Sequence, residues 1–193
     1  MSKFLVIAEK PSVAQSYAKN LSAYKREDGY LEGESCIVSW CLGHLAEYAQ
    51  PEEYDPKYEK WQFDDLPILP EAWKLKVSKD KKKQFDVLKG LMNRSDVEYL
   101  VNGCDAGREG ELIFQRVYVL AGCRKPVKRL WISSMEDAAI QKGFQTMKSE
   151  EEYKNLCMAA VCRAQADWLI GMNGTRAYTT RYFKRFVVGR VQT

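Results

Sequence analysis

One segment in the middle of the chain constrains the fold more than any other. It is an apolar run that ends in an acidic, glycine-punctuated turn and continues as an amphipathic helix. The run Val97-Glu98-Tyr99-Leu100-Val101 has the composition of a buried strand, and Gly103 and Gly107 mark its end. From Glu109 to Ala121 apolar residues recur at helical spacing. Because ligands of parallel α/β sheets bind at the carboxyl ends of strands, this turn is expected to hold a functional site.

The turn is crowded with charge. It carries the carboxylates of Asp105, Glu109 and Glu111 and the guanidinium of Arg108. Carboxylates placed so close together repel one another unless a cation lies among them, and Mg²⁺ is a hard cation that prefers oxygen ligands. The turn therefore predicts a magnesium site suited to phosphate chemistry.

A second strand-to-helix turn, at the start of the chain, carries similar residues. Residues 3–8 form an apolar strand pattern, Glu9 and Lys10 follow it, and Pro11 suits the first turn of the next helix. An acid at this place could simply be favoured by the helix dipole. Acid and base together at both turns favour a shared site instead, in which Glu9 faces the acidic turn if the two strands are neighbours.

Composition limits the class of protein. Over 193 residues, 46% hydrophobic and 29% charged residues are typical of a globular chain. No apolar segment approaches the roughly 20 residues of a membrane span, and no signal-peptide pattern is present. The six cysteines form no C-x-x-C pair, which favours reduced, buried thiols in the cytoplasm over a zinc site or disulfides. For the lone histidine, His44, we expect a structural hydrogen bond rather than a catalytic role.

Charge is distributed unevenly along the chain. Residues 154–193 contain seven Lys and Arg against the single acid Asp167, a balance of +6. Since the whole chain carries +4, residues 1–153 carry −2. An acidic part followed by a basic one indicates a polyanionic partner that contacts both.

Strand and helix patterns alternate along the first part of the chain. Beyond the two turns we expect a hairpin within residues 29–42, a long ordered loop over 48–73, a strand at 73–77, a helix at 79–92, a strand at 127–132 and a helix at 135–147 capped by Ser133 or Ser134. This alternation predicts an α/β fold with a doubly wound parallel sheet. After residue 150 only helical patterns follow, so we expect an α/β domain over 1–150 and a helical domain over 151–193.

Six motifs in series resemble the Toprim domain of type IA DNA topoisomerases, most closely the bacterial topoisomerase III branch. They are Phe4-Leu5-Val6-Ile7-Ala8-Glu9-Lys10-Pro11-Ser12, Gly43-His44-Leu45, Asp105-Ala106-Gly107-Arg108-Glu109-Gly110-Glu111-Leu112, Arg129-Leu130-Trp131-Ile132-Ser133-Ser134, the stretch 163–177 and the stretch 188–193. DNA primases and recombination mediators share the Toprim core but are not expected to carry the last two motifs.

The resemblance implies a Rossmann-like Toprim sheet with flanking helices, followed by the start of a helical domain that grips single-stranded DNA. The family cleaves one DNA strand through a tyrosine, passes a strand through the gap and reseals it, which relaxes negative supercoils or decatenates DNA. The reaction uses Mg²⁺ and no ATP, because the covalent intermediate conserves the phosphodiester energy. We therefore expect single-stranded or negatively supercoiled DNA as partner, a cytoplasmic, nucleoid-associated location, no zinc and, by default, a monomer.

The resemblance also assigns residue roles. It implies that Asp105 and Glu109, with Glu9 and in some degree Glu111, bind Mg²⁺, and that Glu9 exchanges a proton with the 3′ oxygen at the break. Lys10 and Arg108 would contact the scissile phosphate. DNA contacts are expected from the tail residues Arg163, Asp167, Arg176, Arg190 and Gln192.

Two features depart from the family pattern. Its acidic motif is Asp-x-Asp-x-Glu, whereas the middle position here is Gly107, so we expect a weaker or singly occupied Mg²⁺ site. No tyrosine of this chain has the sequence context of the nucleophile, so the 193 residues are expected to be inactive alone. Two alternatives stay open: a Toprim-type nuclease that hydrolyses DNA with water, and a non-catalytic module that binds single-stranded DNA.

Overall fold

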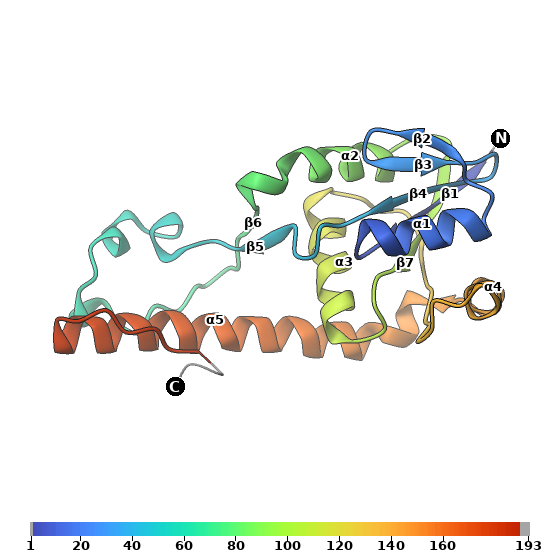
Figure 1. Cartoon of the computed structure of the whole chain (residues 1–193). Helices are drawn as coiled ribbons and strands as arrows, with labels where there is room; N and C mark the ends of the chain where they lie inside the picture. Colours follow the sequence, from blue (N-terminus) through green and yellow to red (C-terminus); the bar gives the residue numbers. More distant parts are fainter. Residues whose placement is uncertain (1, 190–193) are drawn as a thin grey trace. The chain divides into compact units, whose positions relative to one another are not determined.

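A seven-stranded sheet organises the first of two compact units in the computed structural model, which describes residues 2–189 (Figure 1). The unit consists of the chain up to Glu47 together with Val77–Ala160. The strands, in their order across the sheet, are β2 (Lys25–Glu27), β3 (Tyr30–Glu32), β4 (Cys36–Trp40), β1 (Lys3–Ala8), β7 (Val97–Gly103), β8 (Val127–Arg129) and β9 (Lys148–Ser149). Strand β1 pairs in parallel with β4 and β7, and β7 pairs in parallel with β8. The outer pairings are antiparallel, so the predicted parallel sheet forms the centre of a mixed one.

Helices cover both faces of this sheet. Leu5 and Ile7 of β1 pack with residues of α2 (Lys82–Met92) and α3 (Arg108–Leu120). Val6 and Ala8, which point to the other face, pack with residues of α1 (Pro11–Asn20) and α4 (Asp137–Gln145). A central strand buried on both faces needs an unbroken apolar sequence, which explains the run at residues 4–8.

The second unit is built from two segments that are distant in sequence, Tyr48–Lys76 and Val161–Thr193. The first segment contains the short 3-10 helices η1 (Pro51–Glu53), η2 (Pro56–Glu59) and η3 (Phe63–Asp65); the second contains most of α5 (Lys154–Tyr182). The remaining elements of the chain are β5 (Ala46–Tyr48), β6 (Leu75–Val77), η4 (Lys79–Lys81) and η5 (Glu150–Tyr153). Strands β5 and β6 pair as a small sheet of their own.

Aromatic packing forms the core of the second unit. Trp168 of α5 is buried against Tyr54 and Trp73, and its indole N–H donates to the carbonyl oxygen of Ala49 at 3.0 Å. The side-chain amide of Asn173 both accepts from the backbone N–H of Ile68, at 2.6 Å, and donates to the carbonyl oxygen of Ile68, at 3.0 Å. These contacts order the loop that the sequence predicted over residues 48–73.

Some expected element boundaries differ from the structure. Helix α4 begins at Asp137 rather than Met135, with Glu136 and not a serine at its N-cap. Strand β2 was not predicted, and β8 ends at Arg129 rather than at Ile132. The predicted domain boundary at residue 150 stays a prediction. In the structure, the segment 48–76 belongs to the same compact unit as most of the C-terminal helix α5.

Two further expectations concern the cysteines and the membrane. Cys36, Cys41, Cys104 and Cys123 are buried free thiols, whereas Cys157 is partly exposed and Cys162 exposed. Within residues 2–189 the helices are too short or too polar to cross a bilayer.

Candidate active site

The two acidic turns meet at one edge of the sheet. Strands β1 and β7 are parallel neighbours, and their register pairs Ala8 with Gly103, the last residue of each strand. Glu9 follows Ala8 directly, and Asp105 lies two residues after Gly103. The prediction that the two strands are neighbours is therefore confirmed, and the carboxyl ends of both open onto the same place.

Lys10 lies between the acids of the two turns. Its Nζ is 3.7 Å from Oε1 of Glu9 and 3.5 Å from Oδ2 of Asp105. The Glu9 side chain is only 12% exposed, and its second oxygen, Oε2, is buried with no hydrogen-bond partner among the described residues. A buried carboxylate oxygen without a partner is costly, so this atom is positioned to receive a ligand.

His44 joins the site from the loop after β4. Its Nε2 lies 3.5 Å from Oε2 of Glu109, while Gly43 takes a left-handed conformation (φ 65°) and donates its N–H to the carbonyl oxygen of Glu9 at 3.3 Å. Burial, followed by the positive charge of Arg116, lowers the pKa of His44, which keeps the imidazole neutral at pH 7. Sequence reasoning favoured a structural histidine, but the Gly43-His44-Leu45 motif was a signal that this residue lies at the site.

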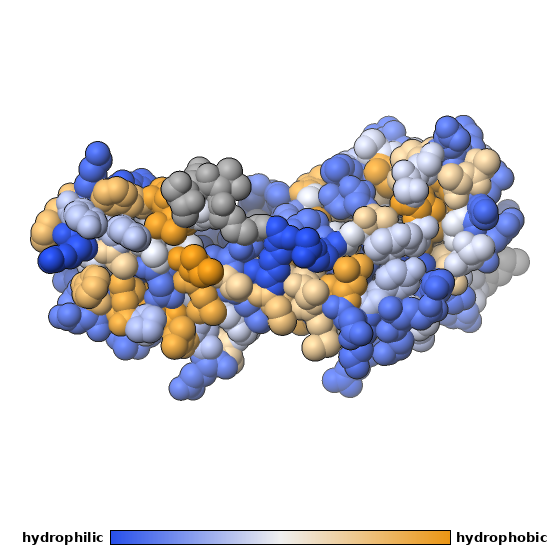
Figure 2. All heavy atoms as spheres, turned by 90° about the horizontal axis from the view of Figure 1, so that it is seen from below, coloured by the Kyte–Doolittle hydropathy of each residue, from blue (hydrophilic) through white to orange (hydrophobic). Residues whose placement is uncertain are grey.

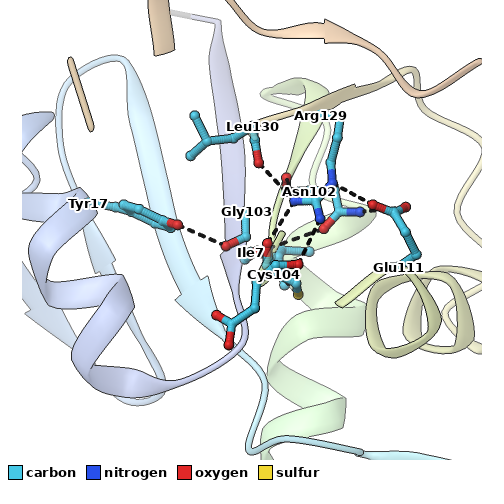
Figure 3. Close-up of polar contacts among 9 residues, drawn as sticks. Ile7, Tyr17, Asn102, Gly103, Cys104, Glu111, Arg129 and Leu130 are labelled. Atoms are coloured by element: carbon cyan, nitrogen blue, oxygen red, sulfur yellow. Dashed lines mark hydrogen bonds and ion pairs between the residues drawn. The ribbon is translucent and has the colours of Figure 1, made fainter. Parts of the chain in front are cut away.

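A buried arginine holds the end of β7 in place (Figure 3). Arg129 is fully buried, and its Nε pairs with Oε1 of Glu111 at 2.5 Å. Its Nη1 donates to the carbonyl oxygens of Asn102, Cys104 and Leu130 at 3.0, 2.7 and 2.8 Å. Its Nη2 donates to the carbonyl oxygen of Asp105 at 2.9 Å. One guanidinium thereby fixes the backbone from which the Asp105 carboxylate projects.

The structure places Glu111 in the interior of the first unit, and its expected role as a metal ligand stays a prediction. This residue is completely buried, pairs with Arg129 and accepts a hydrogen bond from Asn102 at 3.3 Å. Glu109, two residues earlier on α3, is exposed. Residues two apart on a helix do not share a face, so only Glu109 of this pair is directed toward the site. Glu111 acts as the internal counter-ion of Arg129.

The electrostatics of the Arg129–Glu111 network can be tested at Glu150, which lies beside it on η5. Burial, followed by the negative charge of Glu111, raises the pKa of Glu150 to about 7. The folded chain then keeps a proton that the unfolded chain loses above its ordinary carboxyl pKa, so stability should fall as the pH rises from about 4.5 to 7. We expect Glu150→Gln to raise the free energy of unfolding at pH 8 by about 1–2 kcal/mol, discounted for partial exposure, and to change it little at pH 4. Urea unfolding at both pH values measures this; parallel pH profiles of the variant and parent chains would contradict it.

A glycine allows the acidic turn to fold back over the first turn of α3. A Cβ atom added at Gly110 would lie closer than 3.0 Å to the carbonyl oxygen of Asp105. Only glycine permits this approach of two backbone segments. The Asp105 backbone is thus held from two sides, by the guanidinium of Arg129 and by contact with Gly110.

The expected DNA-contacting residues fall into three groups. Arg163 and Asp167 are partly exposed on α5. Arg176 is buried and committed to the protein: it donates to the carbonyl oxygen of Tyr58 at 2.6 Å and to Glu52 at 3.3 Å. In this structure Arg176 holds the η2 loop, and its expected contact with DNA stays a prediction. Arg190 and Gln192 lie outside the described residues.

The donor chemistry of the site fits an open magnesium site. Within residues 2–189, no three His, Cys, Asp or Glu side chains lie close enough together to hold a metal ion. The ammonium group of Lys10, a cation, lies between Glu9 and Asp105 instead. In phosphate-processing sites Mg²⁺ commonly takes only one or two carboxylates, and waters and phosphate oxygens complete its shell. Glu9, with its unpartnered buried oxygen, and Asp105 fit that pattern.

Comparison with known proteins then assigns the family. The Toprim domain family matches residues 4–135 of the chain. The chain belongs to the Toprim domain family. This Toprim chain is 50% identical over all 193 residues to DNA topoisomerase 3 of Bacillus subtilis (strain 168), and 51% identical to DNA topoisomerase 3 of Bacillus cereus (strain ATCC 14579). It spans 26% of the length of each of these relatives.

A solved structure supports the same fold. Topoisomerase I from Thermotoga maritima is similar with a TM-score of 0.59 at 20% identity, over 89% of this chain and 25% of that one. The predicted α/β Toprim fold, followed by a long helix, is therefore confirmed. The chain is homologous to the Toprim region of bacterial DNA topoisomerase 3, as its six motifs predicted.

Proposed function

We propose that this Toprim chain is the metal-binding part of a type IA DNA topoisomerase that transiently cleaves and rejoins one DNA strand, and so relaxes negative supercoils or decatenates DNA. The observation that carries the proposal is the convergence of Glu9, Lys10 and Asp105 at the adjoining ends of β1 and β7. The names of the relatives support it. We further propose that the protein acts on single-stranded or negatively supercoiled DNA, without ATP or zinc, in the cytoplasm at the bacterial nucleoid, as a monomer.

Each residue of the site has a proposed task. Glu9 and Asp105 would be the direct ligands of Mg²⁺, with Glu109 as a further acid beside them, and the ion would neutralise charge on the scissile phosphate. Lys10 would donate to a phosphate oxygen, and the exposed guanidinium of Arg108 can present two parallel N–H donors to a phosphate. Glu9, partly shielded from water, would exchange a proton with the 3′ oxygen at the break.

We propose that the nucleophilic tyrosine is none of the tyrosines of this chain. Tyr17 supports this view, since it is buried and donates to the carbonyl oxygen of Gly103 at 3.1 Å, and burial raises its pKa. A buried hydroxyl that donates to a backbone carbonyl is poorly placed to attack a phosphate. No other tyrosine has the sequence context of the nucleophile.

The proposal is tested by grafting this chain onto a relative. Its 193 residues would replace the matching region of Bacillus subtilis DNA topoisomerase 3. The alignment with that relative covers the whole of this chain. The chimera is expected to relax negatively supercoiled plasmid only with Mg²⁺, and Glu9→Gln to slow relaxation by about 10²–10⁴-fold. The isolated chain is expected to leave the plasmid unchanged. Nicked or linear plasmid from the isolated chain would favour the nuclease, and relaxed closed circles would place the nucleophile within these residues.

A magnesium titration examines the consequence of Gly107. With glycine at that position, calorimetry is expected to give a single Mg²⁺ per chain, and Asp105→Asn to weaken binding at least about tenfold, or ~1.4 kcal/mol. Asp80→Asn, at an exposed acid near the start of α2, is the control and should change nothing. Two tightly bound ions would refute the single-site hypothesis. Binding of single-stranded DNA that needs no Mg²⁺, with no relaxation by the chimera, would favour the non-catalytic module.

A further inference from the structure

Three aromatic rings at the end of α5 form a half-exposed cluster in the second unit. Tyr178 and Tyr182, one helical turn apart, stack with ring centroids 6.2 Å apart and an interplanar angle of 11°. Phe186 packs against both, at 6.2 and 5.8 Å. The three residues, the aromatic cluster below, are nevertheless 49%, 61% and 37% exposed.

The cluster is held in place by hydrogen bonds. After α5 the chain runs back beside the helix (Figure 1). The Thr179 hydroxyl accepts from the backbone N–H of Phe186 at 3.1 Å, and the Thr175 hydroxyl accepts from that of Val188 at 2.9 Å. Two hydrogen bonds to side chains thus fix the segment that follows α5, so the exposed rings have a defined arrangement.

Positively charged residues alternate with the rings along the end of α5 and the segment that follows it. Arg181, Lys184 and Arg185 are exposed among the aromatic residues, and no acid follows Asp167 in the sequence. Figure 2 shows hydrophobic and strongly hydrophilic residues side by side at the left end of the view, over the part that carries the C-terminal turns of α5. Phe183 and Val187 add apolar surface, at 95% and 55% exposure.

The combination of exposed aromatic rings and cations indicates which class of ligand the cluster binds. Soluble proteins seldom expose contiguous apolar surface without a binding role. Aromatic rings interleaved with cations are the features by which proteins bind single-stranded nucleic acid, since unpaired bases stack on rings while the backbone follows positive charge. A duplex hides its base faces and could use only the cations.

We propose that Tyr178, Tyr182 and Phe186 form a platform on which bases of single-stranded DNA stack, with Arg181, Lys184 and Arg185 contacting the phosphates. The proposal rests on the proposed function only in taking DNA as the ligand. It needs neither the metal nor the acidic turns, and it uses residues other than the expected contacts Arg163 and Asp167.

The test measures binding of a fluorescent oligothymidylate by anisotropy without Mg²⁺. Tyr182→Ala is expected to weaken binding about 5- to 150-fold, the range for one lost base stack, and to leave the salt dependence unchanged. Tyr182→Phe should bind as the parent does, because stacking needs no hydroxyl. Arg185→Gln should instead reduce the slope of log affinity against log salt by about 0.7. Tyr24→Ala, at a 71% exposed tyrosine of the first unit, is the matched control and should bind normally.

Three results would contradict the proposal. Unchanged affinity of Tyr182→Ala, with circular dichroism showing a folded chain, would overturn the proposal, as would equal affinity for duplex of the same length. If Tyr182→Ala altered oligomeric state but not DNA binding, the cluster would be a protein-docking surface and the proposal wrong. Glu9→Gln separates this proposal from the proposed function, because it should slow relaxation by the chimera about 10²–10⁴-fold while oligothymidylate binding persists.

Discussion

Arg129→Met is expected to cost the isolated chain about 3–5 kcal/mol of unfolding free energy, the range found when one partner of a buried ion pair is removed. The variant leaves the fully buried Glu111 without its counter-ion, and it also removes the donor from three carbonyl oxygens at the end of β7 and from that of Leu130 after β8. Urea unfolding followed by circular dichroism measures the loss. Since domains of this size are stable by only about 5–15 kcal/mol, the midpoint should fall substantially.

The control for this prediction is an exposed ion pair of the same unit. Lys148 pairs with Glu152 at 2.8 Å, but both side chains are more than half exposed. Lys148→Met should therefore leave the unfolding free energy nearly unchanged. Arg129→Lys, which keeps the charge but not the five-donor fork, should fall between the two. A loss of under about 1 kcal/mol for Arg129→Met would show that the network does not stabilise the fold.

Gly110→Ala is expected to destabilise the chain by about 1–3 kcal/mol and to weaken Mg²⁺ binding as well. Its new methyl group would collide with the Asp105 backbone, which cannot swing aside as the end of a side chain can. Relief requires the acidic turn to move, and the Asp105 carboxylate moves with it. Urea unfolding and calorimetry together test both effects.

A second glycine provides the matched control. Gly90 lies in α2 near its end, and a Cβ atom there would meet nothing within 4 Å. Gly90→Ala should therefore stabilise the chain by about 0.5–1 kcal/mol through the helix propensity of alanine, with Mg²⁺ binding unchanged. If Gly110→Ala were as harmless as Gly90→Ala, the turn would not depend on close backbone approach.

The sequence predicted the centre of the fold because its signals there are local. The apolar runs ending at Ala8 and Gly103 and the helical spacing after each identify two strand-to-helix turns, and the rule for parallel sheets places both turns at one edge. The neighbouring position of Glu9 and Asp105 follows from those facts. The roles of the individual side chains in the site remain predictions.

Other features depend on contacts that no local pattern records. An arginine at the end of a strand looks the same in sequence whether it is buried or exposed, so the internal role of Arg129 could not be predicted. Glu111 was a different case, because its spacing of two from Glu109 already placed the two acids on different helix faces. Arg176 lies three residues after Asn173, on the side of α5 that binds the loop, but the loop has no periodicity from which this pairing could be predicted.

The discontinuous second unit has a consequence for how the chain folds as it is synthesised. Its loop segment, Tyr48–Lys76, leaves the ribosome well before the α5 residues that complete its core, and α2, β7, α3, β8 and α4 are all made in between. At about 5–20 residues per second, Tyr54, Trp73 and their neighbours wait several seconds for Trp168. During that interval the nascent chain exposes an aromatic-rich loop whose core is not yet complete.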